Sequence, residues 1–290
     1  MTPMTKIQVS NFHYRRRKII NRFNAFACAL CCVFAIGVLL LLMGYVFYRG
    51  ISAINLDFFI HMPSPVGEAG GGVANALAGT LILVSSASLL GVPVGVFTGL
   101  YLAEYGNSFY AQVIRFSTDI LNGLPSIVMG LFAYALIVIP FQHFSGYAGA
   151  LALALLMIPV IVRTTEEVVK LVPHTLREAA MALGIRRWKI ILRIVLSTAK
   201  PGIVTAIILA VARITGETAP LLFTSFGNQF WQTHLNEPMA SLTLQIFTYA
   251  ISPYEDWQAK AWAGALVLMG FSLIVNLLAR YTTRNRLQGR

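Results

Sequence analysis

The chain has 290 residues, of which 57% are hydrophobic and 11% carry a charge, and its formal net charge is +11. Its mean hydropathy is +0.71, and so few polar side chains cannot cover the surface of a water-soluble protein of this size. These values exclude an ordinary soluble protein and indicate a chain that lies in a membrane.

The first apolar segment, residues 25–47, contains no charged residue. As a helix it measures about 34 Å, at ~1.5 Å per residue, which is enough to cross a hydrocarbon core of ~30 Å. It is longer than the apolar part of a cleaved signal peptide, so we expect an uncleaved first membrane span. All three cysteines (Cys28, Cys31 and Cys32) lie in it, and we interpret them as small hydrophobes that face lipid or core.

Five further, mainly apolar segments are predicted to span the membrane, at residues 75–102, 116–140, 147–162, 202–226 and 261–279. The predicted fold is therefore all-α, with six membrane-spanning helices and both termini on one side of the membrane. In the second span Gly91, Gly95 and Gly99 lie on one helical face. Such a row of small residues lets two helices pack closely in lipid.

Basic residues are concentrated on one side of this topology. They lie before residue 23, between residues 163 and 200 and after residue 279, whereas the loops at 48–73 and 227–260 are mainly acidic. The positive-inside rule assigns the basic side to the cytoplasm, so both termini are expected there. Because topology accounts for the net charge, we do not infer nucleic-acid binding from it.

The polar segment at residues 163–200 has a distinctive spacing. It reads Glu178-Ala179-Ala180, three residues, Gly184, nine residues, Ile194, one residue and Leu196. Thr175 and Glu178 have the spacing of a capping box, which predicts a helix that runs to Leu183 and ends at Gly184. The apolar residues that follow recur at helical spacing and predict an amphipathic helix leading into the fifth span: Trp188, Ile191, Leu192 and Val195.

This spacing resembles the EAA loop of the permease subunits of binding-protein-dependent ABC importers, with Ser197 where that family usually has Pro. The resemblance implies a short helix that sits in a groove of a separate ATPase subunit. The residues expected to couple to that subunit are Arg177, Glu178, Ala179, Ala180 and Gly184. The sequence has no Gly-x-x-x-x-Gly-Lys-Ser/Thr loop, so ATP and Mg²⁺ are expected to be used by the partner. We expect no enzymatic activity, bound cofactor or metal in this chain.

Two opposite charges fall inside the predicted fifth span. Arg213 lies about 18 Å along a helix from Pro201, and a lone Arg at such depth costs about 3 kcal/mol, so it must face protein, a partner or water. Glu217, one turn further on, can pair with it. Gly216 and Pro220 are expected to loosen the helix beside Glu217. The pair is either structural or part of a pathway, and we favour an anion pathway because the planar guanidinium suits a tetrahedral oxyanion.

Other polar residues near the membrane have two interpretations each. Asp119 and Asn122, at the start of the third span, are either caps and interhelical contacts or pathway groups. Arg163, at the end of the fourth span, either extends to the interface or takes part with Glu166 in passage or gating.

Four runs extend the resemblance to the A-type permeases of phosphate-specific ABC importers: GGGVANALAGT at 70–80, YLAEY at 101–105, IVRTTE at 161–166 and ARITGETAPLLFT at 212–224. Similarity extends over about residues 70–280. It implies a type I ABC importer permease fold, with a basic cytoplasmic segment at 1–24, a transmembrane domain at 25–280 and a basic tail at 281–290. Within that domain the coupling loop occupies about 163–200.

The function implied is ATP-driven import of inorganic phosphate across the bacterial cytoplasmic membrane. The implied partners are a sister permease that completes a heterodimer, two ATPase subunits and an external phosphate-binding protein. The residues expected along the substrate pathway are Asp119, Asn122, Arg163, Glu166, Arg213, Glu217 and Thr218. The alternatives are an ABC permease for another oxyanion and an ion-coupled secondary anion transporter.

Overall fold

A computed structural model describes residues 11–65 and 70–287. The regular elements among them are helical, and the only β contact there is an isolated bridge between Phe226 and Met239. The predicted all-α class is confirmed. The α-helices are α1 (Asn11–Gly50), α2 (Leu56–Ile60), α3 (Ala74–Glu104), α4 (Phe109–Gly123), α5 (Ser126–Ala133), α6 (Ile139–Phe141), α7 (Gly146–Lys170), α8 (His174–Ala182), α9 (Arg187–Lys189), α10 (Leu196–Thr215), α11 (Ala219–Leu222), α12 (Leu242–Ala250) and α13 (Glu255–Leu287). A 3₁₀ turn, η1 (Ile51–Ala53), and two π-helical segments, η2 (Tyr134–Val138) and η3 (Ile190–Val195), complete the set.

The chain divides between Arg49 and Gly50 into two units, which are described separately. The first contains α1, which is long and apolar enough to cross a membrane and includes the predicted first span at 25–47. The described side chains of this helix are mostly exposed, and its three cysteines are free and exposed. The helix therefore presents apolar side chains around its circumference, as a span facing lipid or another chain requires.

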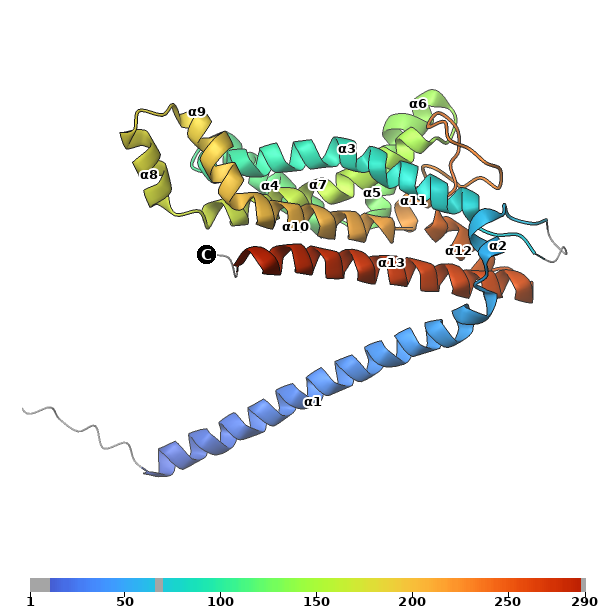
Figure 1. Ribbon diagram of the computed structural model, residues 1–290, viewed down its shortest axis with the longest axis horizontal. Helices are drawn as coiled ribbons and strands as arrows, with labels where there is room; N and C mark the ends of the chain where they lie inside the picture. The colour runs from blue at the N-terminus through green and yellow to red at the C-terminus, as the bar shows by residue number, and fades with distance from the viewer. Residues whose placement is uncertain (1–10, 66–69, 288–290) are drawn as a thin grey trace, which may run out of the picture. The chain divides into compact units, whose positions relative to one another are not determined.

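The second unit is built on the packing of α3 against α7. Gly91, Gly95 and Gly99 are buried at this contact, and a Cβ added to Gly95 would lie 2.8 Å from the Cβ of Ile161. Because the glycines have no side chains, the two backbones approach closely, as their spacing in the sequence predicted. Helix α10 packs against both α3 and α7, and α13 packs against α10. Within this unit, α8 and α9 lie at one end, the α8 end, and α2, α6 and α12 lie at the opposite end, the α12 end (Figure 1).

The prediction of one continuous third span at residues 116–140 is wrong. Helices α4 and α5 meet at a bend of 109°, and the break falls at Leu124 and Pro125, whose backbones are extended. Proline has no N–H for the helix and disfavours helical geometry in the preceding residue, so the helix stops there. The described residues contain five helices that could each cross a membrane, or six spans if this bent pair is counted as one.

The fifth span also differs from the predicted 202–226. A continuous helical stretch of α9, η3 and α10 runs from Arg187 to Thr215 and then ends. If the helix continued, Pro220 would meet the carbonyl group of Gly216, four residues earlier. Pro220 lies instead in the first turn of α11, where a backbone N–H has no acceptor within the helix, so the absence of one costs nothing. The predicted loosening of the helix beside Glu217 is confirmed.

Helix α12 was not predicted, because residues 227–260 were interpreted as a loop. It packs against α13 and α3, and Leu242, Leu244 and Tyr249 on it are buried. Thr80 of α3 accepts a hydrogen bond from the backbone N–H of Leu242 at 2.8 Å, which fixes the start of α12. This short helix therefore belongs to the folded core of the second unit.

Candidate functional site

Arg213 and Glu217 lie together where α10 ends. The Nε atom of Arg213 is 3.9 Å from the Oε1 atom of Glu217, which is an ion pair without a hydrogen bond. The Arg213 side chain is 53% exposed on this chain and the Glu217 side chain 19%. Arg213 therefore faces outward from the folded chain within an apolar helix, and its guanidinium donors are available to another group.

The backbone around Glu217 is held by the unpredicted helix α12. The Thr243 hydroxyl donates a hydrogen bond of 3.0 Å to the Glu217 carbonyl, while the Glu217 N–H bonds to the Ile214 carbonyl at 3.2 Å. Thr218, the next residue, is half-buried and lines a groove together with Thr243 and Ser272 of α13. Helix α12 thus positions the break that carries Glu217 and Thr218.

A second group of charges surrounds Glu166 near the α8 end. Helix α7 continues past residue 162, the predicted end of the fourth span, so Arg163, Glu166 and Lys170 share one helix. The Glu166 side chain is 1% exposed and accepts hydrogen bonds from Arg115 Nη2 at 2.7 Å, Lys170 Nζ at 2.6 Å and Arg163 Nη1 at 3.2 Å. Three cations therefore compensate one buried carboxylate.

Helix α4 supplies the remaining members of this group. Asp119 pairs with Arg163, whose Nε atom lies 2.8 Å from Asp119 Oδ1. We call Arg115, Asp119, Arg163, Glu166 and Lys170 the Glu166 cluster. Its ion pairs join α4 to α7. Asn122 lies next to the cluster on α4 and donates from Nδ2 to the Pro159 carbonyl at 3.5 Å.

The structure thus sorts the seven expected pathway residues into two separate groups. Asp119, Arg163 and Glu166 come together with Asn122 beside them, and Arg213, Glu217 and Thr218 come together at the end of α10. Neither Arg115 nor Lys170 was singled out from the sequence. Lys170 lies four residues after Glu166, and this helical spacing could have identified it, whereas Arg115 reaches Glu166 from α4 and no local spacing indicates that contact.

Helix α8 contains the EAA-like residues, and its start differs from the prediction. It begins at His174 after Pro173, and no side chain caps it, so the capping box of Thr175 and Glu178 is wrong. Pro173 makes His174 the first helical residue, and Thr175 already lies inside the helix, where its hydroxyl cannot serve as the N-cap.

The predicted end of α8 at Gly184 is confirmed. Gly184 has φ +73°, its N–H bonds to the Met181 carbonyl at 2.9 Å, and the Ile185 N–H bonds to the Ala180 carbonyl at 3.3 Å. These two bonds form a Schellman motif, whose left-handed residue favours glycine.

The five expected coupling residues do not share one exposed face. Glu178, Ala179 and Gly184 are exposed, whereas Ala180 is buried in a cluster with Val169 and Ile190. Arg177 is mostly buried as well, with a side chain that is 14% exposed and pairs within the chain. We therefore correct the expectation that Ala180 lies on an outer surface of the helix, because its small side chain allows α8 to pack on its own chain.

The amphipathic prediction for the next segment is only partly correct. Ile191 and Val195 are buried as expected, but Trp188 and Leu192 are exposed and Ile190 is buried instead. The π-helical segment η3 begins at Ile190 and adds a residue to the turn, which shifts the buried face away from that of an ideal α-helix.

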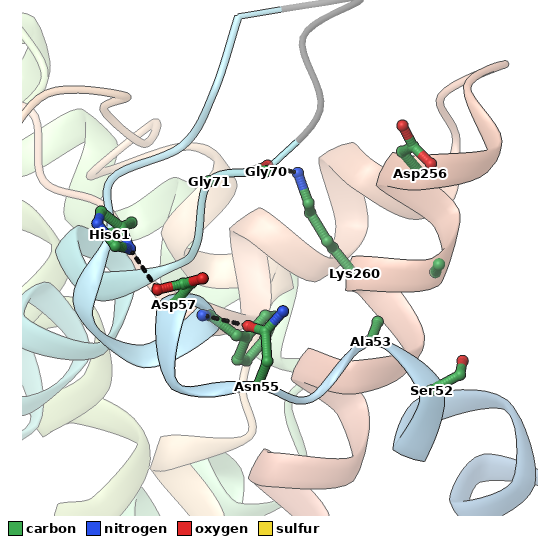
Figure 2. Close-up of a pocket in the computed structure, with 11 residues that line it drawn as sticks. Ser52, Ala53, Asn55, Asp57, His61, Gly70, Gly71, Asp256 and Lys260 are labelled. Atoms are coloured by element: carbon green, nitrogen blue, oxygen red, sulfur yellow. Dashed lines mark hydrogen bonds and ion pairs between the residues drawn. The ribbon is translucent and has the colours of Figure 1, made fainter.

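A pocket between the η1–α2 segment and α13 is shown in Figure 2. In it Asp57 pairs with His61 at 3.2 Å, and the Nζ atom of Lys260 donates to the Gly70 carbonyl. Both basic groups thus have partners within the chain. We interpret these contacts as holding the loop that precedes α3 against α13.

Solved structures with the same arrangement of helices are ABC transporters. A chain of the bacterial alginate ABC transporter, solved with a periplasmic protein bound to an alginate pentasaccharide, has a TM-score of 0.62 and 15% identity, covering 93% of this chain and 96% of that one. A chain of the inward-facing MetNI methionine ABC transporter has a TM-score of 0.59 and 19% identity, covering 74% and 94%. The fold is that of a type I ABC transporter permease.

Sequence comparison places the chain more closely. The family model described as "Binding-protein-dependent transport system inner membrane component" matches residues 91–287, and the chain belongs to this family. It is a multi-pass membrane component and not an ATP-hydrolysing enzyme.

Two curated relatives share about half of its residues. The "Phosphate transport system permease protein PstA" of Yersinia pestis is 48% identical over 268 residues, covering 92% of this chain and 90% of the relative. The protein of the same name from Haemophilus influenzae is 51% identical over 233 residues, covering 80% and 82%.

Proposed function

We propose that this chain is a permease subunit of an ATP-driven importer of inorganic phosphate and forms half of the translocation pathway. The observation that carries the proposal is Arg213, a cation within an apolar helix whose side chain is half exposed and only loosely paired with Glu217. A pathway lined in part by another subunit explains why this guanidinium is not sealed inside its own chain. The names of the PstA relatives support phosphate as the substrate.

The two charges suggest how an oxyanion passes. Phosphate displaces Glu217 as the partner of Arg213 and accepts parallel hydrogen bonds from the guanidinium fork. Glu217 then pairs with Arg213 again, so the anion is released rather than trapped. A protonated phosphate also donates a hydrogen bond to Glu217, which fully ionised sulfate cannot do. Thr218 offers a hydroxyl group beside them.

The Glu166 cluster has a different place in this scheme. We propose that it lies on the cytoplasmic side of the pathway, where Arg163 and the nearby Asn122 are close to the emerging anion. Arg163 is bound to Asp119 and Glu166, so its first role there is to hold α4 against α7. It reaches phosphate only if one of these contacts opens.

The α8 segment is proposed to couple the chain to its motor. Exposed Glu178 and Ala179 would face a groove of the ATPase, with Gly184 ending the helix. The complete importer would contain a sister permease, two ATPase subunits and an external phosphate-binding protein, and the ATPase would use ATP and Mg²⁺. This chain would hold no cofactor of its own.

The same scheme fixes the orientation in the bacterial cytoplasmic membrane. The α8 end, the basic segment at 1–24 and the basic tail at 281–290 would lie in the cytoplasm, following the positive-inside rule. The transmembrane domain would occupy residues 25–280.

The test is uptake of inorganic phosphate by proteoliposomes that contain the complete importer. Arg213→Ala is expected to lower uptake by at least about tenfold, because the passing anion loses charge-assisted hydrogen bonds worth ~1.5–3 kcal/mol. Copurification of the ATPase checks that the complex still assembles. Lys200→Ala, which removes an exposed cation from the same helix, is the matched control and should leave uptake unchanged.

Three results would contradict the proposal. Wild-type uptake by Arg213→Ala would remove Arg213 from the pathway. Sulfate competing as well as phosphate would favour a broader oxyanion permease. Uptake driven by a proton gradient without ATP and binding protein would favour a secondary transporter.

A further inference from the structure

The YLAEY run at residues 101–105 has no part in the function proposed so far. It ends α3, a helix whose single charged residue is Glu104 at the last position. The Oε1 atom of Glu104 accepts hydrogen bonds from Arg177 of α8, at 3.1 Å from Nε and 2.9 Å from Nη2. The two side chains are 8% and 14% exposed, so water screens this ion pair only weakly.

Arg177 also joins α8 to the end of α7. Its Nη1 atom donates to the Val172 carbonyl at 2.7 Å and its Nη2 atom donates to the Val169 carbonyl at 3.3 Å. The Val169 carbonyl lies in the last turn of α7 and also accepts the Val172 N–H at 3.2 Å, and Val172 lies two residues beyond this helix. A nearby Arg commonly donates to carbonyl groups at such a helix end. One guanidinium therefore bonds to α3 and to the α7 terminus while it is carried by α8.

A second contact connects the same end of α3 to the start of α9. The Arg187 guanidinium lies 4.9 Å from the ring centroid of Tyr105, and its Nη2 atom donates to the Glu104 carbonyl at 3.3 Å. On the inner side, Ala180 packs against buried apolar residues. The segment from α8 to α9 is thus attached to α3 on both sides of Gly184.

Helix α3 in turn has little freedom to move independently of α7. A Cβ added to Gly99 would lie 2.6 Å from the Val162 carbonyl oxygen, and one added to Gly95 would lie 2.8 Å from the Cβ of Ile161. Such contact along the two helices makes them move as a pair. A displacement applied to Glu104 therefore reaches the helices on which the second unit is built.

We infer that the Glu104–Arg177 ion pair is the joint that transmits movement of α8 to the α3–α7 pair, and that Glu104 is a positioning residue for transport. The inference rests on the proposed function, because it requires a motor that moves α8. It differs from a route along the backbone, which would pass from α8 through η3 into α10 and would not need Glu104.

The experiment compares variants in proteoliposomes that contain the complete importer, and measures phosphate taken up per ATP hydrolysed. Glu104→Gln and Arg177→Gln are each expected to lower this ratio about tenfold, within the usual range of coupling between distant sites. The charge-exchanged double variant, Glu104→Arg with Arg177→Glu, is expected to recover to within about threefold of wild type, because the ion pair returns but the bonds to the α7 carbonyls do not. Glu167→Gln removes an exposed carboxylate of α7 and is the matched control, with an unchanged ratio.

Recovery of the uptake per ATP in the charge-exchanged variant would show that the ion pair itself transmits the movement. A residue with only a structural role would not regain coupling in this way. Single variants that remain coupled like wild type would overturn the inference, and so would a coupling loss, or a loss of ATPase copurification, that the exchange does not repair.

Failure of the inference can be told apart from failure of the proposed substrate. A second measurement, the stimulation of ATP hydrolysis by the external binding protein, is made on the same variants. If wild type moved another oxyanion in place of phosphate, the proposed substrate would be wrong, but the stimulation measured in each variant would still test the role of the Glu104–Arg177 ion pair.

Discussion

Two carboxylates in this protein lie one helical turn after an arginine, and the structure treats them differently. Glu166 follows Arg163 within α7 and is buried among three cations, whereas Glu217 follows Arg213 across the end of α10 and is 3.9 Å from it. Helix α7 continues beyond its pair, and α4 adds Arg115 to it. The spacing in the sequence is thus a poor guide to the strength of a charge pair, which depends on whether the helix continues and what lies beside it.

The largest difference between the two pairs is expected in stability. Glu166→Ala would leave three neighbouring cations without their shared carboxylate. We expect a loss of about 2–3 kcal/mol in the free energy of unfolding, less than the ~3–5 kcal/mol for a fully buried pair, because the cations can turn to water. Thermal unfolding of the purified chain in detergent measures it. Glu167→Gln, its exposed neighbour, should change stability by less than about 0.5 kcal/mol, and an equal loss in both variants would contradict the assigned role of the cluster.

Helix α7, which carries Glu166, packs against α3, and this packing can be disrupted without changing any charge. Gly95→Ala would place a Cβ 2.8 Å from the Cβ of Ile161, so α3 and α7 must separate. Overpacking of this kind costs about 1–3 kcal/mol, and the same unfolding measurement detects it. Gly270→Ala in α13 is the control, since a Cβ there meets nothing within 4 Å. If both substitutions were neutral, the α3–α7 contact would be looser than described.

A smaller effect is expected at the end of α8. Gly184→Ala places a β-carbon on a residue with φ +73° but meets nothing within 4 Å, so the cost is conformational and about 1 kcal/mol. Gly184→Asn should cost less, because Asn tolerates the left-handed region better. Unfolding measurements on both variants should show a larger loss of stability for Ala than for Asn. Equal losses would mean that the positive φ of residue 184 is not the cause of the destabilisation.

The smallest stability effect is expected for the loosely paired carboxylate. Glu217→Gln should change the free energy of unfolding by about 0.5 kcal/mol or less, because its partner is more than half exposed. The same variant should slow phosphate uptake, since the group that displaces the anion from Arg213 has lost its charge. A large stability loss with normal uptake would reverse the comparison with Glu166.

Much of the framework was predictable from local sequence. Apolar runs located the helices that could cross a membrane, and the glycine spacing predicted close packing of the helix now seen as α3. Gly184 marked a helix end, and Gly216 with Pro220 marked a weak point in the predicted fifth span, where α10 in fact ends. Pro125 was visible as well, yet the uncharged run around it suggested an unbroken span. For this segment, backbone geometry at one residue outweighed the hydropathy of many.

The partners of the polar residues could not be predicted in the same way. Arg177 bonds to Glu104, 73 residues earlier in the chain, and Glu166 bonds to Arg115, 51 residues earlier. Helical periodicity only relates residues a few positions apart. The burial of Ala180 and the formation of α12 likewise depend on elements distant in sequence, so only the folded chain reveals them.

The end of α10 at Thr215 has a consequence for affinity. The peptide dipoles of a helix sum to about half an elementary negative charge at its C-terminus. An anion that approaches Arg213, two residues before that terminus, would be attracted by the guanidinium and repelled by the last carbonyl groups. These opposing interactions within a single helical turn would keep the affinity for the anion low and its residence time short. A transport pathway requires weak binding of this kind, whereas a high-affinity binding site does not.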